Sequence, residues 1–365
     1  MRRSPYLAGV WLASVFLVSN FSPLIVSVWE MSLWERPLWG QSSVEDRLTV
    51  EGRNAVRRGL EYLKRHQNSD GSWTDKIGRK VHFAYKGRQG KHIGVTALAC
   101  MAFLSNGSLP GRGPYAEQVE RGLDYVLKHT QTNGFISVNE SRMYSHAFAS
   151  LFLAEIYGMT GMEKVRKKLK RAVSLIVQAQ NSQGGWRYQP GAPDADMSIT
   201  VCQVMALRAA HNAGIHIPKV TIDNAIRYVR LSYNPRRSAF QYQQSPSSRH
   251  SFALTAAGVT ALYGAGAYDD EFIRSGLVFM WEHLPRHFQA ADRFDYYYGV
   301  YYGTQAAFQC GGEYWEKWHE YFWRDMLKLQ SRDGSWKDLV GRNYGTAMAC
   351  VILQVPYQYL PIFER

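Results

Sequence analysis

Two kinds of apolar segment alternate along the chain. The first kind is charged and amphipathic, with apolar residues at three- and four-residue spacing in 55–65 and 162–171, as in a helix with one wet face. The second kind is almost entirely small and apolar, which predicts a helix buried on most sides. Six segments of the second kind occur, at 95–104, 146–154, 199–207, 253–262, 303–308 and 345–353. Six inner helices surrounded by six outer ones predict an all-α fold, the α/α toroid.

A short phrase, Gln-x-x-x-Gly-x-Trp, recurs at long intervals. A shortened copy lies at 131–135, and further degenerate copies are expected near 230 and 280, where 232–237 and 283–287 resemble broken turns. A period of about 50 residues gives six units and indicates a repeat architecture. The three full copies contain Gln67, Gly71 and Trp73; Gln180, Gly184 and Trp186; and Gln330, Gly334 and Trp336.

The phrase has a structural interpretation. Gln near the end of an outer helix bonds free carbonyl groups, Gly permits the turn, and Trp buries a large face between neighbouring hairpins.

The repeated phrase resembles the motif of the terpenoid cyclase and protein prenyltransferase superfamily, which includes squalene–hopene cyclases. The resemblance covers roughly residues 50–363 and implies a six-hairpin α/α toroid. Complement-type thioester proteins share that toroid, but their Gly-Cys-Gly-Glu-Gln motif is absent from this chain.

The N-terminus predicts export. A basic start with Arg2 and Arg3 precedes residues 5–29, none of which is charged, a pattern of secretory signals and of uncleaved membrane anchors. Residues 1–30 are therefore predicted to be a signal peptide or anchor, 31–48 a linker, and 49–365 the toroid. Either alternative places the toroid outside the cytoplasm. It is then expected to be periplasmic or extracellular, or to be anchored in the membrane by its N-terminus.

The net charge of +13 is concentrated in the early helices and in 164–171. Nucleic acid is not an expected partner outside the cytoplasm, so an anionic membrane surface or an acidic polymer fits these charges better. A solvated face that keeps the protein soluble is the alternative. The four cysteines, Cys100, Cys202, Cys310 and Cys350, are predicted to be small buried thiols and not disulfides.

Polar residues recur where the inner helices begin, above helices that are otherwise apolar. All six beginnings face one end of the ring, so a cavity with a polar rim is expected there, a common form of small-molecule site. The residues at these positions are His92, His146, Asp194 with Asp196, His250, Tyr301 with Tyr302, and Asn343 with Tyr344.

Asp194-Ala-Asp196-Met197 resembles the Asp-x-Asp-Asp acid motif of class II terpenoid cyclases. The resemblance implies that Asp196 protonates an alkene with Asp194 as its partner, since burial and a neighbouring carboxylate raise the pKa of one carboxyl. Met197 replaces the last Asp of the motif, and full-length cyclases have a second domain of this kind. The alternative is that Asp196 and Ser198 cap the inner helix.

The remaining candidate residues concern a metal site and further ligand contacts. The zinc ligands of prenyltransferases do not carry over, because no Asp-x-Cys occurs. A cluster of His92, His146, His250 and Asp196 is chemically suited to zinc, but no metal or cofactor is predicted. The aromatic stretch 294–308 either lines the cavity or fills a gap in the fifth unit. From it and the last inner helix, we predict ligand contacts by Tyr298, Tyr301, Tyr302, Gln305 and Tyr344.

The sequence thus predicts a squalene-cyclase-like toroid that binds an isoprenoid-like or apolar ligand, with cyclase or isomerase activity as an extension. One alternative is a non-catalytic scaffold that docks on a membrane or anionic polymer through its basic outer face. Another is a polysaccharide-active enzyme, on fold analogy alone.

Overall fold

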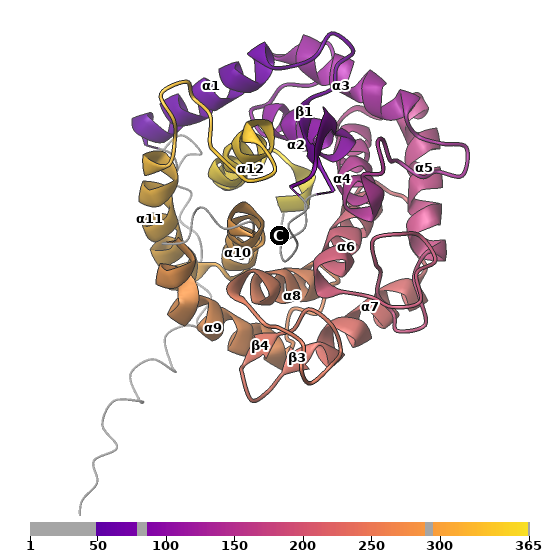
Figure 1. Cartoon of the computed structure of the whole chain (residues 1–365), viewed down its shortest axis with the longest axis vertical. Helices are drawn as coiled ribbons and strands as arrows, with labels where there is room; N and C mark the ends of the chain where they lie inside the picture. The colour runs from indigo at the N-terminus through magenta and orange to yellow at the C-terminus, as the bar shows by residue number, and fades with distance from the viewer. Residues whose placement is uncertain (1–48, 79–85, 289–294, 364–365) are drawn as a thin grey trace, which may run out of the picture. The chain divides into compact units, whose positions relative to one another are not determined.

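The fold is a double ring of helices (Figure 1). The computed structural model describes residues 49–78, 86–288 and 295–363, all within the compact unit Trp39–Arg365. Among these residues, six outer helices alternate with six inner ones, so the predicted α/α toroid of six hairpins is confirmed. The outer helices are α1 (Val50–Arg65), α3 (Ala116–Lys128), α5 (Glu163–Gln178), α7 (Lys219–Leu231), α9 (Glu271–Phe288) and α11 (Gly312–Lys328). The inner helices are α2 (Ile93–Leu104), α4 (Arg142–Thr160), α6 (Met197–Asn212), α8 (Phe252–Gly264), α10 (Tyr296–Cys310) and α12 (Arg342–Gln354).

The alternation of amphipathic and apolar segments explains the two rings. Every residue of α2 is buried, whereas α1 buries one stripe and exposes its charged face. Each inner helix packs against its neighbours in the ring, and α12 packs against α2 to close it. The thiols of Cys100, Cys202 and Cys350 are free and buried, as predicted, while Cys310 is half-buried.

Two short antiparallel hairpins join outer to inner helices. The first pairs β1 (Thr74–Ile77) with β2 (Arg88–Lys91), and the second pairs β3 (Tyr233–Asn234) with β4 (Ala239–Phe240). The second hairpin contains the predicted turn at 232–237. The turn predicted at 283–287 is wrong, because this segment lies inside α9. Pro285 lies within this helix, where it removes one backbone hydrogen bond.

The glutamine of each full phrase links two hairpins. Gln67 Nε2 donates to its own turn at Gly71 O over 3.0 Å, and also to Gln118 O in the next outer helix over 2.9 Å. Gln180 repeats this with Gly184 O and Thr221 O. Gln330 does so with Gly334 O and Ala55 O. The predicted structural role is confirmed, with a partner in the following unit that the sequence did not indicate.

The glycine and tryptophan of the phrase fix the turn between the helices. Gly184 has φ +91°, and a Cβ there would lie 2.3 Å from Asn224 O, so the next helix can approach only a glycine. Trp186 is 1% exposed, and its indole N–H donates to Ile176 O over 2.7 Å. Its backbone N–H donates to Thr200 Oγ1 over 3.2 Å, which ties the turn to the inner helix.

The C-terminal segment fills the end of the ring where the inner helices finish. The short helices η2 (Val355–Tyr357) and η3 (Pro361–Phe363) follow α12, and η3 packs against α4 and α6. Ile362 N donates to the buried Glu155 Oε2 over 3.4 Å. A cavity of about 20 Å³ remains beside Ile362, enough for about one water molecule.

The predicted signal or anchor at 1–30 and the linker at 31–48 lie outside the described residues. Within the described ranges, no helix combines the length and the apolar character that a membrane span requires.

Candidate ligand-binding site at the mouth of the toroid

The end of the ring where the inner helices begin, here called the mouth, is organised around Asp196. This residue has extended backbone just before α6, and its Oδ1 accepts the Ile199 N–H over 2.9 Å. Asp196 therefore caps the helix, as one of the two sequence interpretations stated. Its side chain is fully buried, and Ser198 Oγ donates to the same oxygen over 2.5 Å.

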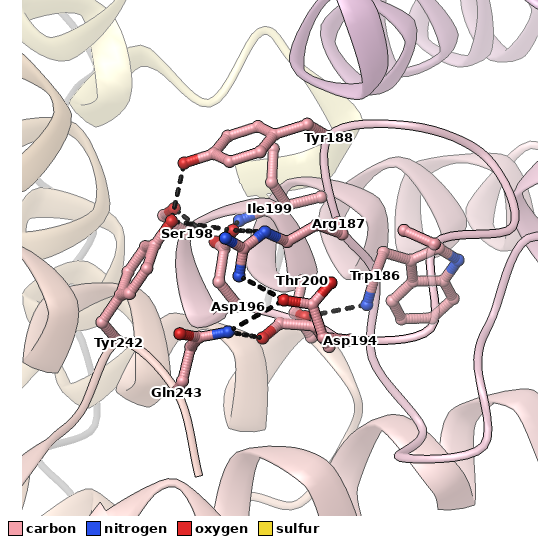
Figure 2. A network of polar contacts seen from close by, with 12 residues as sticks. Trp186, Arg187, Tyr188, Asp194, Asp196, Ser198, Ile199, Thr200, Tyr242 and Gln243 are labelled. Atoms are coloured by element: carbon pink, nitrogen blue, oxygen red, sulfur yellow. Dashed lines mark hydrogen bonds and ion pairs between the residues drawn. The ribbon is translucent and has the colours of Figure 1, made fainter. Parts of the chain in front are cut away.

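Arg187 holds the two aspartates together (Figure 2). It lies 3.0 Å from Asp194 Oδ2 and, through Nε, 3.5 Å from Asp196 Oδ2. Gln243 Nε2 also donates to Asp194 Oδ2, over 3.2 Å. The Arg187 guanidinium lies over the rings of Tyr188 and Tyr242, 5.1 and 5.6 Å from their centroids.

The protonation of Asp196 is set by opposing effects. Burial raises the pKa of its carboxyl group above the usual value, although the hydrogen bonds from Ser198 and Ile199 and the charge of Arg187 oppose this rise. The N-terminus of α6 also favours a negative charge. Two of its neighbours can only donate, the Ile199 N–H beside Oδ1 and the Arg187 Nε–H beside Oδ2, and a donor against each oxygen favours the carboxylate form.

Two chains of hydroxyl groups converge on this carboxylate. On one side, Tyr144 O–H donates to Ser198 Oγ over 2.7 Å, and Ser198 donates to Oδ1 of Asp196. On the other side, the Tyr188 and Tyr242 hydroxyls lie 2.6 Å apart, and Tyr242 donates to Oδ2 over 3.2 Å. Tyr144 and Tyr188 are half-buried, so each chain runs from the mouth into the wall.

Below the mouth, tyrosines of α10 cross the lumen to α6. Tyr298 O–H donates to Ser198 O over 3.1 Å, and the Tyr302 hydroxyl lies 3.1 Å from Cys202 Sγ. Tyr301 is 1% exposed, and its ring lies 6.2 Å from that of Phe148 on α4. Tyr301 and Tyr302 therefore fill the lumen, and Tyr298 forms its half-buried upper surface.

The predicted histidines do not meet at the mouth. His92 caps α2 by accepting the Val95 N–H over 3.3 Å, and burial lowers its pKa to about 4. His250 is exposed and lies edge-on to Phe279 of the outer helix α9.

The prediction that His146 contacts a ligand is wrong. Its side chain is fully buried in α4, Nδ1 accepts the Ile136 N–H over 3.1 Å, and Nε2 lies 3.2 Å from Ala172 O. It takes the position that Thr200 and Thr346 occupy in other units, where the threonine hydroxyl accepts the N–H of the phrase tryptophan. The considered zinc cluster therefore does not form, and the described part of the chain contains no group of three metal-binding side chains.

The last two predicted ligand residues, Tyr344 and Gln305, lie at opposite ends of the inner helices. Tyr344 is half-buried near the start of α12, and its N–H donates to Asp75 Oδ2 over 2.7 Å. Asp75 thereby joins the first unit to the last, and burial raises its pKa to about 7. Gln305 lines the small cavity at the opposite end of the inner helices, beside Ile362 and Phe363, so it does not share a site with Asp196.

Five residues of the site were not predicted from the sequence: Arg187, Tyr144, Tyr188, Tyr242 and Gln243. Two signals were available. Arg187 directly follows the phrase tryptophan Trp186. Tyr144 precedes His146 by two residues, the register that Tyr344 has relative to Thr346.

Comparisons with known proteins agree with this architecture. Residues 39–160 match the family described as the squalene-hopene cyclase C-terminal domain. A stretch of 146 residues is 30% identical to human lanosterol synthase, covering 38% of this chain and 18% of that protein. The chain thus corresponds to less than a fifth of its curated relative.

Solved structures show the same toroid in proteins of different activity. Type II terpene cyclase MstE from Scytonema, in complex with geranylgeranyl dihydroxybenzoate, matches with a TM-score of 0.55 and 13% identity, over 86% of this chain and 98% of that chain. Cellobiose 2-epimerase from Bacillus thermoamylovorans matches with a TM-score of 0.62 and 14% identity, over 82% of this chain and 98% of that chain. An α-1,6-mannanase of Salegentibacter sp. HEL1_6, in complex with α-1,6-mannotriose, matches with a TM-score of 0.60 and 10% identity, over 86% of this chain and 100% of that chain.

The chain is therefore an α/α toroid with a tyrosine-lined polar mouth. The predicted resemblance to the terpenoid cyclase superfamily is confirmed by the family match and by the similarity to lanosterol synthase.

Proposed function

We propose that this protein binds an isoprenoid-like small molecule at the mouth of the toroid. The observation that carries the proposal is the ring of half-buried tyrosines above the buried Asp196. Tyr144, Tyr298 and Tyr344 project from inner helices, and Tyr188 lies on the loop before α6. Aromatic faces suit an apolar chain, while Arg187 and Asp194 supply a polar edge for a head group.

The comparisons support this ligand class. The similarity at the level of sequence is to cyclases of isoprenoids, whereas the two sugar-active proteins share only the fold at 10–14% identity. The terpene cyclase among the structural neighbours likewise shares only the fold, at 13% identity, and its toroid holds a geranylgeranyl compound, an apolar chain with a polar aromatic head.

The geometry favours binding over alkene protonation. An acid of that kind must present a proton to the ligand, whereas both oxygens of Asp196 face donors of the wall. Cyclase or isomerase chemistry with Asp196 as acid and Asp194 as partner is the extension of the proposal. Asp196→Asn should then abolish turnover of polyprenoids, and unchanged turnover would remove Asp196 as the acid.

The binding proposal is tested by titrating the purified protein with geranylgeraniol and following heat by calorimetry. We expect saturable binding that Tyr298→Ala weakens by about tenfold, since an aromatic face contributes about 1–1.5 kcal/mol beyond its buried area. Tyr359→Ala is the matched control, because Tyr359 is 50% exposed and lies outside the mouth. Absence of saturable binding would refute the proposal.

A basic surface on α5 favours a second candidate function, docking on anionic lipid. This helix contains six basic residues and a single acidic one, Glu163. Lys164 pairs with Asp124 and Arg166 with Glu163, while Lys167, Lys170 and Arg171 are exposed. Sedimentation with vesicles containing phosphatidylserine should fall when these last three are changed to Gln, and unchanged sedimentation would exclude this surface.

Export of the toroid is part of the proposal. Its support is the uncharged segment 5–29 that follows Arg2 and Arg3. Fusion of alkaline phosphatase to the C-terminus reports the compartment directly, because that enzyme is active only outside a bacterial cytoplasm. An inactive, stable fusion would refute export.

A further inference from the structure

The hydroxyl hydrogens of three mouth tyrosines are all used by the protein itself. Tyr144 donates to Ser198 Oγ, and Tyr298 donates to Ser198 O. A phenol has one hydrogen and two lone pairs. Each of these oxygens can therefore accept a further hydrogen bond but has no hydrogen left to donate.

Tyr188 reaches the same state through Tyr242. The Tyr242 hydrogen is committed to Asp196 Oδ2 over 3.2 Å. The 2.6 Å contact between the two phenols must then use the Tyr188 hydrogen. Tyr188 thus donates into the wall, like Tyr144 and Tyr298.

Asp196 sets the direction of both chains. Its Oδ1 meets the Ile199 N–H and its Oδ2 meets the Arg187 Nε–H, and neither of these donors can accept a hydrogen bond. With the carboxylate as terminal acceptor, every hydroxyl hydrogen in the two chains points toward Asp196 and away from the mouth. Hydrogen-bonded chains of this kind strengthen one another.

We infer that Tyr144, Tyr188 and Tyr298 form an acceptor-only site that selects ligands carrying a hydroxyl hydrogen. This inference rests on the proposed function and makes the ligand an isoprenoid alcohol rather than a hydrocarbon or an ether. The alcohol donates its hydrogen to a tyrosine oxygen while its chain lies on the aromatic rings. Asp196 and Ser198 act as positioning residues, because they hold the tyrosine hydrogens without touching the ligand.

A pair of ligands that differ in one hydrogen-bond donor tests the inference. Geranylgeraniol and its methyl ether have the same chain, but only the alcohol donates. We expect calorimetry to show about tenfold tighter binding of the alcohol, the factor that corresponds to one hydrogen bond of about 1–1.5 kcal/mol. Equal affinities would overturn the acceptor-only site and leave the isoprenoid site standing, whereas binding of neither ligand would overturn both.

Three variants show whether the two chains of hydroxyl groups are responsible. Tyr144→Phe and Tyr188→Phe each remove one acceptor and should reduce the preference for the alcohol, while Tyr359→Phe should not. Ser198→Ala leaves the Tyr144 hydrogen without its acceptor, so this hydroxyl can turn and donate to the ether oxygen. The methyl ether should then bind more tightly to Ser198→Ala than to the unmodified protein. A preference unchanged in all three mouth variants would contradict the inference, and circular dichroism confirms that each variant is folded.

Discussion

The side-chain amide of Gln330 donates to the carbonyl oxygen of Ala55 over 2.8 Å, across 275 positions of sequence. This bond joins the last phrase to the first outer helix and so closes the ring. The same contact links Gln67 to Gln118 and Gln180 to Thr221 in the middle of the chain. One bond type therefore serves both to stack successive hairpins and to close the toroid.

Gln330→Ala should lower the free energy of unfolding by about 2–3 kcal/mol, because it removes three hydrogen bonds, two donated by the amide and one accepted from Arg58, and leaves acceptors near a buried junction. Urea unfolding followed by circular dichroism measures this loss. Gln189→Ala is the control, since Gln189 is exposed, and its effect should stay within about 0.5 kcal/mol. Equal losses in the two variants would show that the closing bond contributes nothing specific.

Gly184→Ala should prevent stable folding or cost more than about 3 kcal/mol. The added Cβ would lie 2.3 Å from Asn224 O in a backbone with φ +91°, so strain and collision add. Gly191→Ala has a similar φ of +75° but nothing within 4 Å. Only the conformational cost of about 1 kcal/mol remains there. Thermal melts that shift equally for both would contradict the proposed contact.

The buried carboxyl of Asp75 should make stability fall as pH rises. Its pKa is raised by burial from 3.8 to about 7, so the folded protein keeps a proton that the unfolded chain releases above pH 4. The contribution of Asp75 to the free energy of unfolding is therefore fully present below pH 4. It is lost as the pH rises toward 7, a decrease of about 2–4 kcal/mol.

Asp75→Asn provides the control, because it keeps an oxygen for the Tyr344 N–H and cannot titrate. The free energy of unfolding, measured in urea at half-unit steps from pH 4.5 to 7.5, should vary less in this variant. A slope identical in both proteins would assign the pH dependence to other groups.

The two aspartates of the mouth, Asp196 and Asp194, should contribute very unequally to the stability of the fold. Asp196→Asn places an amide N–H₂ against the Arg187 and Tyr242 donors at a fully buried position and should cost about 2–3 kcal/mol. The side chain of Asp194 is 49% exposed, and Asp194→Asn should cost less than about 1 kcal/mol. Denaturant unfolding separates these expectations, which fail if the two losses are alike.

The alternation of segments predicted the fold well because burial acts on each helix separately. The all-apolar segments became inner helices and the amphipathic ones outer helices, with the phrases between them. The turn predicted at 283–287 in the fifth unit is wrong, because Pro285 lies inside α9 and a proline signals a turn only when the helix does not continue through it.

The site was harder to predict, since it depends on which residue meets which across the ring. His146 illustrates the problem. A histidine at a predicted mouth position looks like a ligand residue, but its two nitrogens replace the threonine hydroxyl that other units use inside the wall. Asp196 was found because its motif is local, whereas Tyr242 reaches it from another unit.

The sequence by itself determined the helix types, the six-unit repeat, the capping position of Asp196 and the glycine turns, because each depends on local spacing and conformation. Only the tertiary structure decided that Arg187 joins both aspartates, that α10 tyrosines fill the lumen, and that Tyr144, Tyr188 and Tyr298 direct their hydrogens into the wall. These features depend on distances between units, which closure of the ring sets and which no single repeat encodes.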